Sequence, residues 1–430
     1  MRLILVVAVL VAFFGSWRAA RWYFGSEIAL AAPLLPEKAR EAAETATRLS
    51  PDDPLAHWSM ATLKQRSIAA EDLRASIAEF ERAVSLSPLD FRLWVDLGRA
   101  REQFGDLEGG EKALRRGVEL APYYAWPRWQ LGNFLARRGR LDEGFIELRR
   151  AMEADPTMRA AVFDLAWMLY GGEISNIRSA IGESPGVRAE FVSYLLGRKR
   201  VDEALEVWSS LTTDEKKQSA QTGKTLVDNL IAAKRFRAAL ALSADMTEGK
   251  AKAEVGKISN GSFESPVALN STDLFDWRVP SMLQAQAALD STGARDGSLS
   301  LRINFNAPGA LDFQITQLVA VEPAANYRLS LYVRSSNLKS AAAPVVLVMT
   351  AEGKILAESA PVATGKTEWQ QVVMDFKTPG DTDGVTLRIS RVACTAEGSV
   401  CPIYGTVWYD DFNLQLVGRE TVAGAAGRGN

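Results

Sequence analysis

Histidine and cysteine are scarce in this 430-residue chain, which has one histidine, His57, and two cysteines. A serine or cysteine nucleophile activated by histidine needs a positioned imidazole, and zinc sites need several histidine or cysteine ligands. A single histidine beside Trp58 cannot build a multi-histidine site, and two cysteines cannot build a four-cysteine site. We expect His57 to lie on the surface of a helix. The sequence therefore argues against histidine-dependent catalysis and against a structural zinc site.

An excess of charge of either sign is also lacking. The chain has 50 lysine and arginine residues against 52 aspartate and glutamate residues, which gives a net charge of −2. This balance provides no broad positive field for a phosphate backbone, so nucleic-acid binding is disfavoured. In contrast, 47% of the residues are hydrophobic, which is enough for sizeable cores and excludes a disordered or collagen-like chain. The length allows about two to four domains.

The two cysteines lie close together in the sequence. Cys394 and Cys401 flank a loop-like hexapeptide, residues 395–400. A disulfide that closes this loop would imply an oxidising compartment. The alternative is two free thiols, each buried separately, and we favour the disulfide.

An uncharged apolar run follows Met1 and Arg2 and covers residues 3–14. Its length suits a signal peptide, but Trp17, Trp22 and Tyr23 follow it, as aromatic residues do at a membrane interface. We therefore interpret residues 1–30 as a signal-anchor, an uncleaved transmembrane segment. We expect the protein to be anchored in the inner membrane with its bulk facing the periplasm or the outside. If the segment is cleaved, the protein is periplasmic or secreted.

A regular repeat occupies the first half of the chain. Similar phrases end at prolines spaced by 37, 34 and 34 residues, namely Pro51, Pro88, Pro122 and Pro156. The unit that ends at Pro122 also carries Trp94, Leu97-Gly98 and Gly110-x3-Leu114. A 34-residue period with these phrases resembles the tetratricopeptide repeat, in which each unit is a pair of helices.

This resemblance implies a helical solenoid over residues 37–246, followed by a polar linker over residues 247–256. Residues 37–51 supply only a second helix. In the repeat, the first helices line a concave groove that holds a partner protein. The groove positions correspond here to Arg92, Arg99, Trp126, Trp129, Asn133, Arg137, Phe163, Trp167 and Tyr170. Alternatively, Trp126 caps a neighbouring turn, and Phe163 and Trp167 are buried.

The pattern changes to a period of two beyond the linker. Tyr327, Leu329, Leu331 and Val333 alternate with mostly polar residues, which is typical of antiparallel strands in a sandwich. The phrases Asn260-Gly-Ser-Phe-Glu264 and Thr406-Val-Trp-Tyr-Asp-Asp411 open and close this region. Together with the phrases between them, they resemble the jelly-roll carbohydrate-binding modules of the galactose-binding-like class. The resemblance covers residues 257–417, and residues 418–430 are expected to be a disordered tail.

The resemblance also implies candidate metal ligands. In that family the opening and closing phrases surround a structural calcium, and the matching residues here are Glu264 and Asp411, with Asp410 as a third. Oxygen ligands that meet where the first and last strands adjoin suit calcium. The alternative is a strand-end hydrogen bond without metal. No cofactor is required by any other motif.

Strand alternation also predicts a glycan-binding face. If their strands share a sheet, one outward face carries Arg302, Asn304, Arg328, Tyr332 and Arg334. An aromatic ring flanked by hydrogen-bonding side chains suits sugar recognition. The alternative is an ordinary solvated sheet face. Three tryptophans are expected to be core anchors instead, namely Trp277, Trp369 and Trp408.

Taken together, the sequence predicts a multidomain α plus β protein with a membrane anchor, a helical solenoid and an antiparallel β-sandwich. We interpret it as a non-enzymatic, membrane-anchored, extracytoplasmic scaffold that binds a partner protein through the groove and a glycan through the sandwich. By analogy, this suits cell-envelope or exopolysaccharide assembly. One alternative is a protein-interaction scaffold that binds no sugar. The other is a glycan-cleaving enzyme that uses paired carboxylates.

Overall fold

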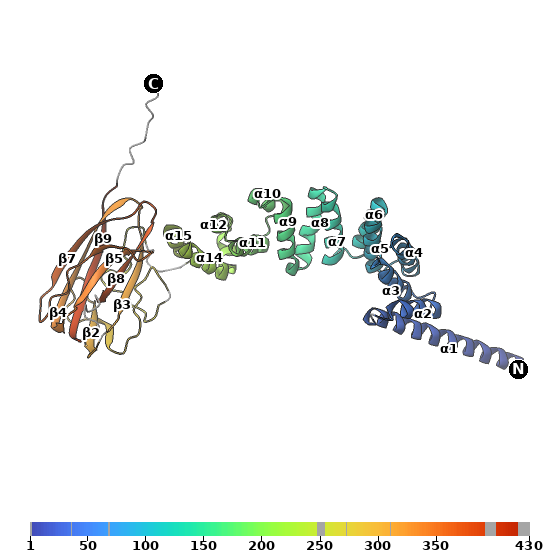
Figure 1. The fold of residues 1–430 in the computed structure, drawn as a ribbon, viewed down its shortest axis with the longest axis horizontal. Helices are drawn as coiled ribbons and strands as arrows, with labels where there is room; N and C mark the ends of the chain where they lie inside the picture. Colours follow the sequence, from blue (N-terminus) through green and yellow to red (C-terminus); the bar gives the residue numbers. More distant parts are fainter. Residues whose placement is uncertain are drawn as a thin grey trace, which may run out of the picture. The chain divides into compact units, whose positions relative to one another are not determined.

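The structure, a computed structural model, describes residues 2–35, 37–67, 69–246, 254–271, 273–309, 311–391 and 401–419. It confirms helices in the first part of the chain and antiparallel strands in the last part (Figure 1). The chain divides into two compact units, Met1–Arg188 and Ala189–Asn430. Each unit is described by itself below.

The first unit consists of helices. They are α1 (Arg2–Ala31), α2 (Ala39–Leu49), α3 (Pro54–Gln65), α4 (Ala70–Leu86), α5 (Phe91–Phe104), α6 (Leu107–Leu120), α7 (Ala125–Arg137), α8 (Leu141–Ala154), α9 (Arg159–Leu169) and α10 (Ile174–Ile181). Two short 3-10 helices, Ala32–Leu34 and Pro156–Met158, lie between them. The pairs α5/α6 and α7/α8 follow the predicted repeat, and α7 and α8 lie side by side in Figure 1.

Local sequence determines where these helices begin. The Asp53 and Asp90 carboxylates each accept a hydrogen bond, at 3.0 Å, from a backbone N–H in the first turn of α3 and α5. Asp106 does the same for α6 by accepting from the N–H of Gly109. Such caps satisfy backbone donors that have no partner within the helix. Each capping aspartate therefore marks the start of a repeat helix.

Glycines allow the paired helices to approach closely. A Cβ at Gly98 would lie 2.7 Å from Cγ of Leu114 and 3.0 Å from the carbonyl oxygen of Gly110. A Cβ at Gly132 would lie 2.9 Å from the carbonyl oxygen of Gly144. The tetratricopeptide repeat usually has alanine at the positions of Gly110 and Gly144. In this structure the backbone at each of these positions lies directly against the backbone of another glycine, Gly98 or Gly132, where a Cβ would be too close. The entropy that a glycine costs in a helix is offset here by close packing.

Helix α2 corresponds to the second helix of a repeat unit, and the C-terminal end of α1 takes the place of the first helix of that unit. Ala29 of α1 is buried with Ala46 of α2 and Ala56 of α3, and Arg21 donates a hydrogen bond to the carbonyl oxygen of Arg48. The apolar stretch Ile4–Leu34, with mean hydropathy 1.7, is long and apolar enough to cross a membrane by length and composition. A signal sequence passes the same test. One helix thus combines the predicted anchor with the first helix of the solenoid.

The second unit begins with helices and ends with the sandwich. Its helices are α11 (Pro185–Gly197, which starts in the first unit), α12 (Val201–Ser209), α13 (Thr213–Gln218), α14 (Ala220–Ala232) and α15 (Phe236–Met246). Both carboxylate oxygens of Asp383, in the sandwich, accept backbone N–H groups of α15, from Phe236 at 3.0 Å and Arg237 at 3.2 Å. The ring of Phe236 also packs against Gly384. Helix α15 is therefore capped by the sandwich.

Nine strands form two antiparallel sheets among the described residues. They are β1 (Ala285–Asp290), β2 (Ser300–Ala307), β3 (Gln314–Ala320), β4 (Ala325–Ser340), β5 (Pro344–Thr350), β6 (Ile355–Glu358), β7 (Gln370–Lys377), β8 (Gly384–Arg391) and β9 (Ile403–Arg419). The five-stranded sheet has the order β1-β2-β9-β4-β7, and the four-stranded sheet has the order β3-β8-β5-β6. The last strand, β9, therefore lies between β2 and β4.

The sandwich core has the alternation that the sequence predicts. Along β4, Tyr327, Leu329, Leu331 and Val333 are buried. Trp277 is fully buried, and its ring centroid lies 5.3 Å from that of Phe263 and 5.0 Å from that of Phe412. The first and last phrases of the domain therefore meet in one aromatic cluster.

The expected disulfide falls partly outside the described residues. Cys401 is buried and disulfide-bonded. Cys394 lies outside the described residues. The pairing of these two cysteines stays a prediction.

The glycine contacts predict an unusual response to a helix-favouring substitution. Gly132→Ala should lower the free energy of unfolding by about 1–2 kcal/mol, because overpacking against Gly144 outweighs the gain of up to about 1 kcal/mol in helix propensity. Gly197→Ala is the matched control, since no atom lies within 4 Å of the added Cβ. Urea unfolding followed by circular dichroism measures both variants. Equal or greater stability of Gly132→Ala would contradict the close approach.

Candidate functional site

The predicted glycan residues share one face of the five-stranded sheet. Arg302 and Asn304 on β2 point outward, as do Arg328, Tyr332 and Arg334 on β4, because buried residues alternate with them in each strand. Strands β2 and β4 belong to the same sheet, but β9 separates them. Arg302 and Arg334 both pair with Trp408 in the strand register, so the three residues form one row across the sheet.

The expectation that Trp369 and Trp408 are core anchors is wrong, because both are partly exposed. Trp408 belongs to this row, and Trp369 lies next to its Arg334. The guanidinium of Arg334 lies over both rings, 5.0 Å from the centroid of Trp369 and 4.5 Å from that of Trp408. The sequence phrase did not show which side of its strand Trp408 faces. In a strand, the neighbours of a buried residue point to the opposite face of the sheet. Trp408 lies between the buried Val407 and Tyr409 and therefore points outward.

Asp290 at the end of β1 holds Trp408 in place. Its carboxylate accepts a hydrogen bond from the indole Nε1 of Trp408 at 2.7 Å and lies 3.6 Å from a guanidinium nitrogen of Arg302. Burial acts to raise the pKa of Asp290, but hydrogen bonds from Trp408 and Thr292 outweigh burial and lower that pKa to about 2. The carboxylate therefore stays ionised, and Trp408 stays anchored, over the whole range in which proteins are normally handled.

The loop between β1 and β2, residues 291–299, forms one border of this face. The backbone N–H groups of Arg295 and Asp296 donate to Asp410, at 2.7 and 3.2 Å. The carboxylate of Glu264 accepts from the N–H groups of Ser298 and Leu299, both at 2.8 Å. The guanidinium of Arg295 in this loop lies 4.5 Å from the ring centroid of Tyr332. Two carboxylates thus hold the loop that covers the edge of the sheet face.

These contacts bear on the calcium prediction. The described residues contain no group of three or more histidine, cysteine, aspartate or glutamate side chains placed to hold a metal. The oxygens of Glu264 and Asp410 accept backbone N–H groups, which would repel a cation approaching from that side. The role of Asp411 and the calcium site itself stay predictions. Burial raises the pKa of Asp410 despite its three backbone donors. The geometry favours the alternative of strand-end hydrogen bonds.

The remaining face residues are already paired with neighbours. Arg328 on β4 forms two hydrogen bonds with Asp375 on β7, at 2.8 and 2.9 Å. The hydroxyl of Thr406 on β9 lies 3.2 Å from the side-chain oxygen of Asn304 on β2. Arg302 also lies next to the Asp290 carboxylate, so the positive charge beside the aromatic rings comes mainly from Arg334 and Arg295.

In the first unit, the predicted groove residues lie partly on a common surface. Arg137 of α7 forms two hydrogen bonds with Glu102 of α5, both at 2.9 Å. The side chain of Gln65 in α3 donates to that of Gln103 in α5 at 3.2 Å. First helices of successive units therefore contact each other through one face. Asn133 donates to the carbonyl oxygen of Trp129 within α7, and Arg99 lies 3.6 Å from Asp96 within α5.

Three of the predicted groove residues are aromatic residues of α9 and its C-terminal end, namely Phe163, Trp167 and Tyr170. Phe163 is 2% exposed, so its side chain fills the interior as the alternative interpretation had it. Tyr170 packs against Phe145 of α8, with ring centroids 5.7 Å apart, and the Trp167 ring lies against Gly172 in the turn after α9. Trp167 and Tyr170 are both partly exposed, so their place in the groove stays a prediction. The contacts between first helices described above join α3, α5 and α7.

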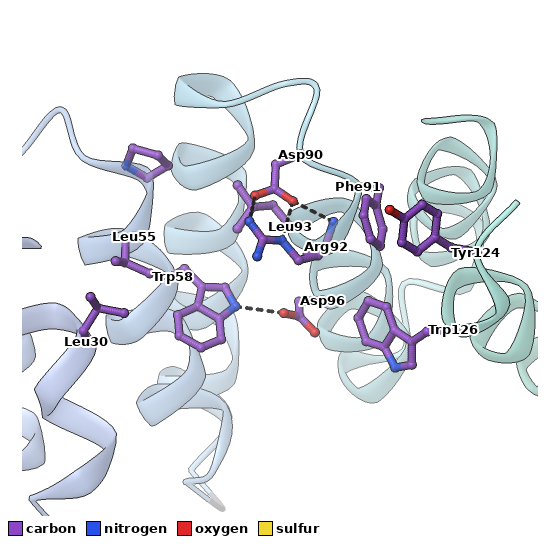
Figure 2. A pocket seen from close by; sticks show the side chains of 11 residues that line it. Leu30, Leu55, Trp58, Asp90, Phe91, Arg92, Leu93, Asp96, Tyr124 and Trp126 are labelled. Carbon is purple, nitrogen blue, oxygen red and sulfur yellow. Dashed lines mark hydrogen bonds and ion pairs between the residues drawn. The ribbon is translucent and has the colours of Figure 1, made fainter. Parts of the chain in front are cut away.

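A cavity of about 730 Å³ lies on this surface. Its lining residues are Leu30, Pro54, Leu55, Trp58, Asp90, Phe91, Arg92, Leu93, Asp96, Tyr124 and Trp126 (Figure 2). Sequence reasoning found Arg92 and Trp126 but missed Trp58 and Asp96. When the groove positions of the repeat are assigned in α3 with Pro54, its first residue, as the start of the unit, Trp58 falls on a groove position. Asp96 lies next to a groove position of α5, and nothing in the sequence singles it out.

His57, on α3 next to Trp58, is not the solvated surface residue that we expected. Its Nδ1 lies 2.7 Å from a carboxylate oxygen of Glu79 on α4, and its Nε2 lies 2.9 Å from the carbonyl oxygen of Pro51. Both ring nitrogens face acceptors, so the protonated imidazole satisfies the site best. The hydrogen bond to Glu79 raises the pKa of His57, and the same bond lowers the pKa of Glu79. His57 is a structural link between α3 and α4.

Comparisons with known proteins found a family for the last part of the chain. The sequence model of a family described as "Carbohydrate binding domain" matches residues 255–391. This part of the chain is therefore similar to a carbohydrate-binding domain, as the sequence phrases indicated. A search of curated proteins found no match.

Solved structures with similar folds fall into two groups. One, from a study of "CBM4 structure and function", is 18% identical, with a TM-score of 0.28, and the match covers 37% of this chain and 99% of that chain. TmCBM61 in complex with β-1,4-galactotriose is 18% identical, with a TM-score of 0.27, covering 38% and 99%. YrrB, a TPR protein with an unusual peptide-binding site, is 18% identical, with a TM-score of 0.29, covering 43% and 86%.

The His57–Glu79 pair predicts a pH-dependent stability. Because the folded-state pKa of His57 is raised, its contribution is complete below the unfolded value of about 6.5 and is lost as the pH rises through the folded value. His57→Gln should therefore destabilise the protein at pH 5.5, by about 1.5 kcal/mol for a hydrogen bond to a charged group. The difference from the unsubstituted chain should shrink as the pH rises above the unfolded pKa and through the raised folded-state pKa of His57.

Urea unfolding between pH 5 and 8 tests this expectation, with Lys112→Gln, on the exposed side of α6, as the control. A difference between His57→Gln and the unsubstituted chain that does not change with pH would show that the pKa of His57 is the same in the folded and unfolded chains, which contradicts the raised pKa.

Proposed function

We propose that this protein is a non-catalytic, membrane-anchored scaffold whose sandwich binds a glycan on the outward face of the five-stranded sheet. The observation that carries the proposal is the Arg334 guanidinium, which lies over the rings of Trp369 and Trp408, with Tyr332 on the same outward face of β4. Aromatic rings bind the apolar faces of sugars, and arginine donates paired hydrogen bonds to hydroxyl or carboxylate oxygens. The similarity of residues 255–391 to a carbohydrate-binding domain supports the same function.

The rigidity of this face also supports the proposal. Asp290 anchors Trp408, and the carbonyl oxygens of Thr292 and Gly293 accept hydrogen bonds from Arg334 and Trp369. Side chains that are held before the ligand arrives lose less conformational freedom on binding. Two arginines, Arg302 and Arg334, lie near Trp408, against one acidic side chain, Asp290. This excess of positive charge favours a glycan with acidic groups over a neutral glycan.

The solenoid provides the second part of the proposed function, the binding of a partner protein. Exposed aromatic residues and arginine, the residue types that dominate interfaces, meet on the face formed by α3, α5 and α7. The apolar α1 would hold this surface at a membrane, with the bulk of the chain outside the cytoplasm. Such a protein suits cell-envelope or exopolysaccharide assembly.

Glycan retention tests the sheet face. On affinity gels containing alginate, xylan or laminarin, the unsubstituted chain should be retarded by at least one polysaccharide. Tyr332→Ala and Trp408→Ala should each weaken that retention about tenfold, which corresponds to about 1.4 kcal/mol. Tyr123→Ala, at a fully accessible tyrosine of the solenoid, is the matched control and should have no effect.

Three outcomes separate the alternatives. Retention without release of reducing ends supports the binding module. Release of reducing ends would identify a glycan-cleaving enzyme. An unsubstituted chain that no polysaccharide retards, or a Tyr332→Ala variant retained as strongly as the parent, would leave only a protein-interaction scaffold.

A double substitution tests the protein-binding surface. Trp129→Ala with Arg137→Ala removes a ring and the ion pair with Glu102 from the common face of α5 and α7. We expect loss of the proteins that the full chain captures from membranes of its native host, measured by quantitative mass spectrometry. Arg116→Ala, in an exposed ion pair on α6, is the control. Unchanged capture by the double variant would contradict a groove at this position.

A further inference from the structure

The cavity of the first unit combines apolar walls with one largely buried acid, Asp96. Four elements form it: Leu30 comes from α1, Trp58 from α3, Asp96 from α5 and Trp126 from α7. Figure 2 shows the Asp96 carboxylate between the rings of Trp58 and Trp126. The pocket therefore has its negative charge at the centre and its aromatic rings on either side.

The aromatic wall is rigid on the side of α7. Phe91 packs against Tyr124 with ring centroids 5.3 Å apart, and against Trp126 at 6.5 Å. Leu55 and Leu30 form the apolar wall on the opposite side, next to Trp58 (Figure 2). A ligand that enters must therefore bring apolar surface that these groups can cover.

The charges of the lining residues do not cancel at the centre. Arg92 is bound by Asp90 through two hydrogen bonds, at 2.9 and 2.7 Å, so its charge is already compensated. Asp96 accepts one hydrogen bond, at 2.8 Å, from the neutral indole of Trp58. Its nearest cation is Arg99 at 3.6 Å, whose side chain is half-exposed, whereas that of Asp96 is 17% exposed. The carboxylate thus faces the cavity with only a solvated, partial counter-charge.

Burial raises the pKa of Asp96 because it takes water away from the charged form. Covering this carboxylate with a purely apolar ligand would increase that cost, since an unpaired charge is expensive to bury. A ligand cation would remove the cost by pairing with the carboxylate. Aromatic rings on both sides also attract cations through their faces.

We propose that this pocket binds a lysine side chain of a partner protein, with its ammonium group against Asp96 and its aliphatic stem between Trp58 and Trp126. The inference rests on the proposed protein-binding role of the solenoid and is independent of glycan binding. A long side chain with an apolar stem and a charged end matches the apolar walls and the acidic centre. Since Leu30 belongs to α1, the partner would be bound beside the end of the anchor helix.

The test uses the full chain in detergent micelles, labelled with 5-fluorotryptophan, and follows the fluorine resonances of Trp58 and Trp126. The probes are three pentapeptides, acetyl-Gly-Leu-Lys-Leu-Gly-amide and its analogues with norleucine or glutamate in place of lysine. The lysine peptide should shift both resonances and bind at least tenfold more tightly than the glutamate peptide. Norleucine, which keeps the stem and lacks the charge, should bind with intermediate affinity.

Substitution of the acid gives the sharper comparison. Asp96→Asn keeps an oxygen that accepts from the Trp58 indole, and it should weaken binding of the lysine peptide about tenfold while leaving the norleucine peptide unchanged. Asp96→Glu should retain the preference for lysine. Glu108→Gln, on the exposed side of α6, is the control and should have no effect.

Equal affinities for the three peptides, or a lysine preference that survives Asp96→Asn, would overturn the proposal. Circular dichroism confirms that each variant is folded before titration, and Asp96→Glu tests the same charge if Asp96→Asn unfolds. Failure here with partner capture that still depends on Trp129 and Arg137 would reject the lysine pocket and leave the protein-binding role intact. Failure of both would reject the role itself.

Discussion

The solenoid depends on the close approach of paired helix backbones at glycine. With no Cβ at Gly98 and Gly110, or at Gly132 and Gly144, each second helix contacts the backbone of its first helix. This contact determines how the first helix is rotated about its axis, because any larger side chain would push the pair apart. The rotation in turn directs Asp96 towards Trp58 and Arg137 towards Glu102. The common surface of α3, α5 and α7 therefore follows from packing on their opposite side.

In the sandwich, two carboxylates determine the position of the loop that borders the proposed glycan face. Asp410 is buried next to the aromatic core, and Glu264 follows the buried Phe263, so both are positioned by the packing of the opening segment of the sandwich against its last strand, β9. Their oxygens accept backbone N–H groups of the loop between β1 and β2. That loop supplies Arg295 and the carbonyl groups that hold Arg334 and Trp369. Residues that resemble metal ligands in sequence thus organise the edge of the proposed glycan face.

The two surfaces have opposite electrostatic character. The cavity of the first unit has a largely buried carboxylate at its centre, whereas the sheet face places guanidinium groups beside aromatic rings. The ligands proposed for the two surfaces therefore carry opposite charges. The second unit also includes α15, whose first N–H groups are capped by Asp383 of the sandwich. The last helix of the chain's helical part is thus fixed to the sandwich that carries the proposed glycan face.

Periodicity in the sequence was sufficient to determine the helix pairs, the strand alternation of β2 and β4, and the outward position of Arg302 and Tyr332. These are properties of neighbouring residues, since a helix repeats every 3.6 residues and a strand every two. Only the tertiary structure decided that β9 separates β2 from β4, that α1 supplies the first helix of the solenoid, and that Phe163 is buried. It also decided that Glu264 and Asp410 bind N–H groups, and that Asp96 meets Trp58. Each of these contacts joins segments that are distant in the sequence, so its formation depends on how whole elements pack and not on the local pattern of residues.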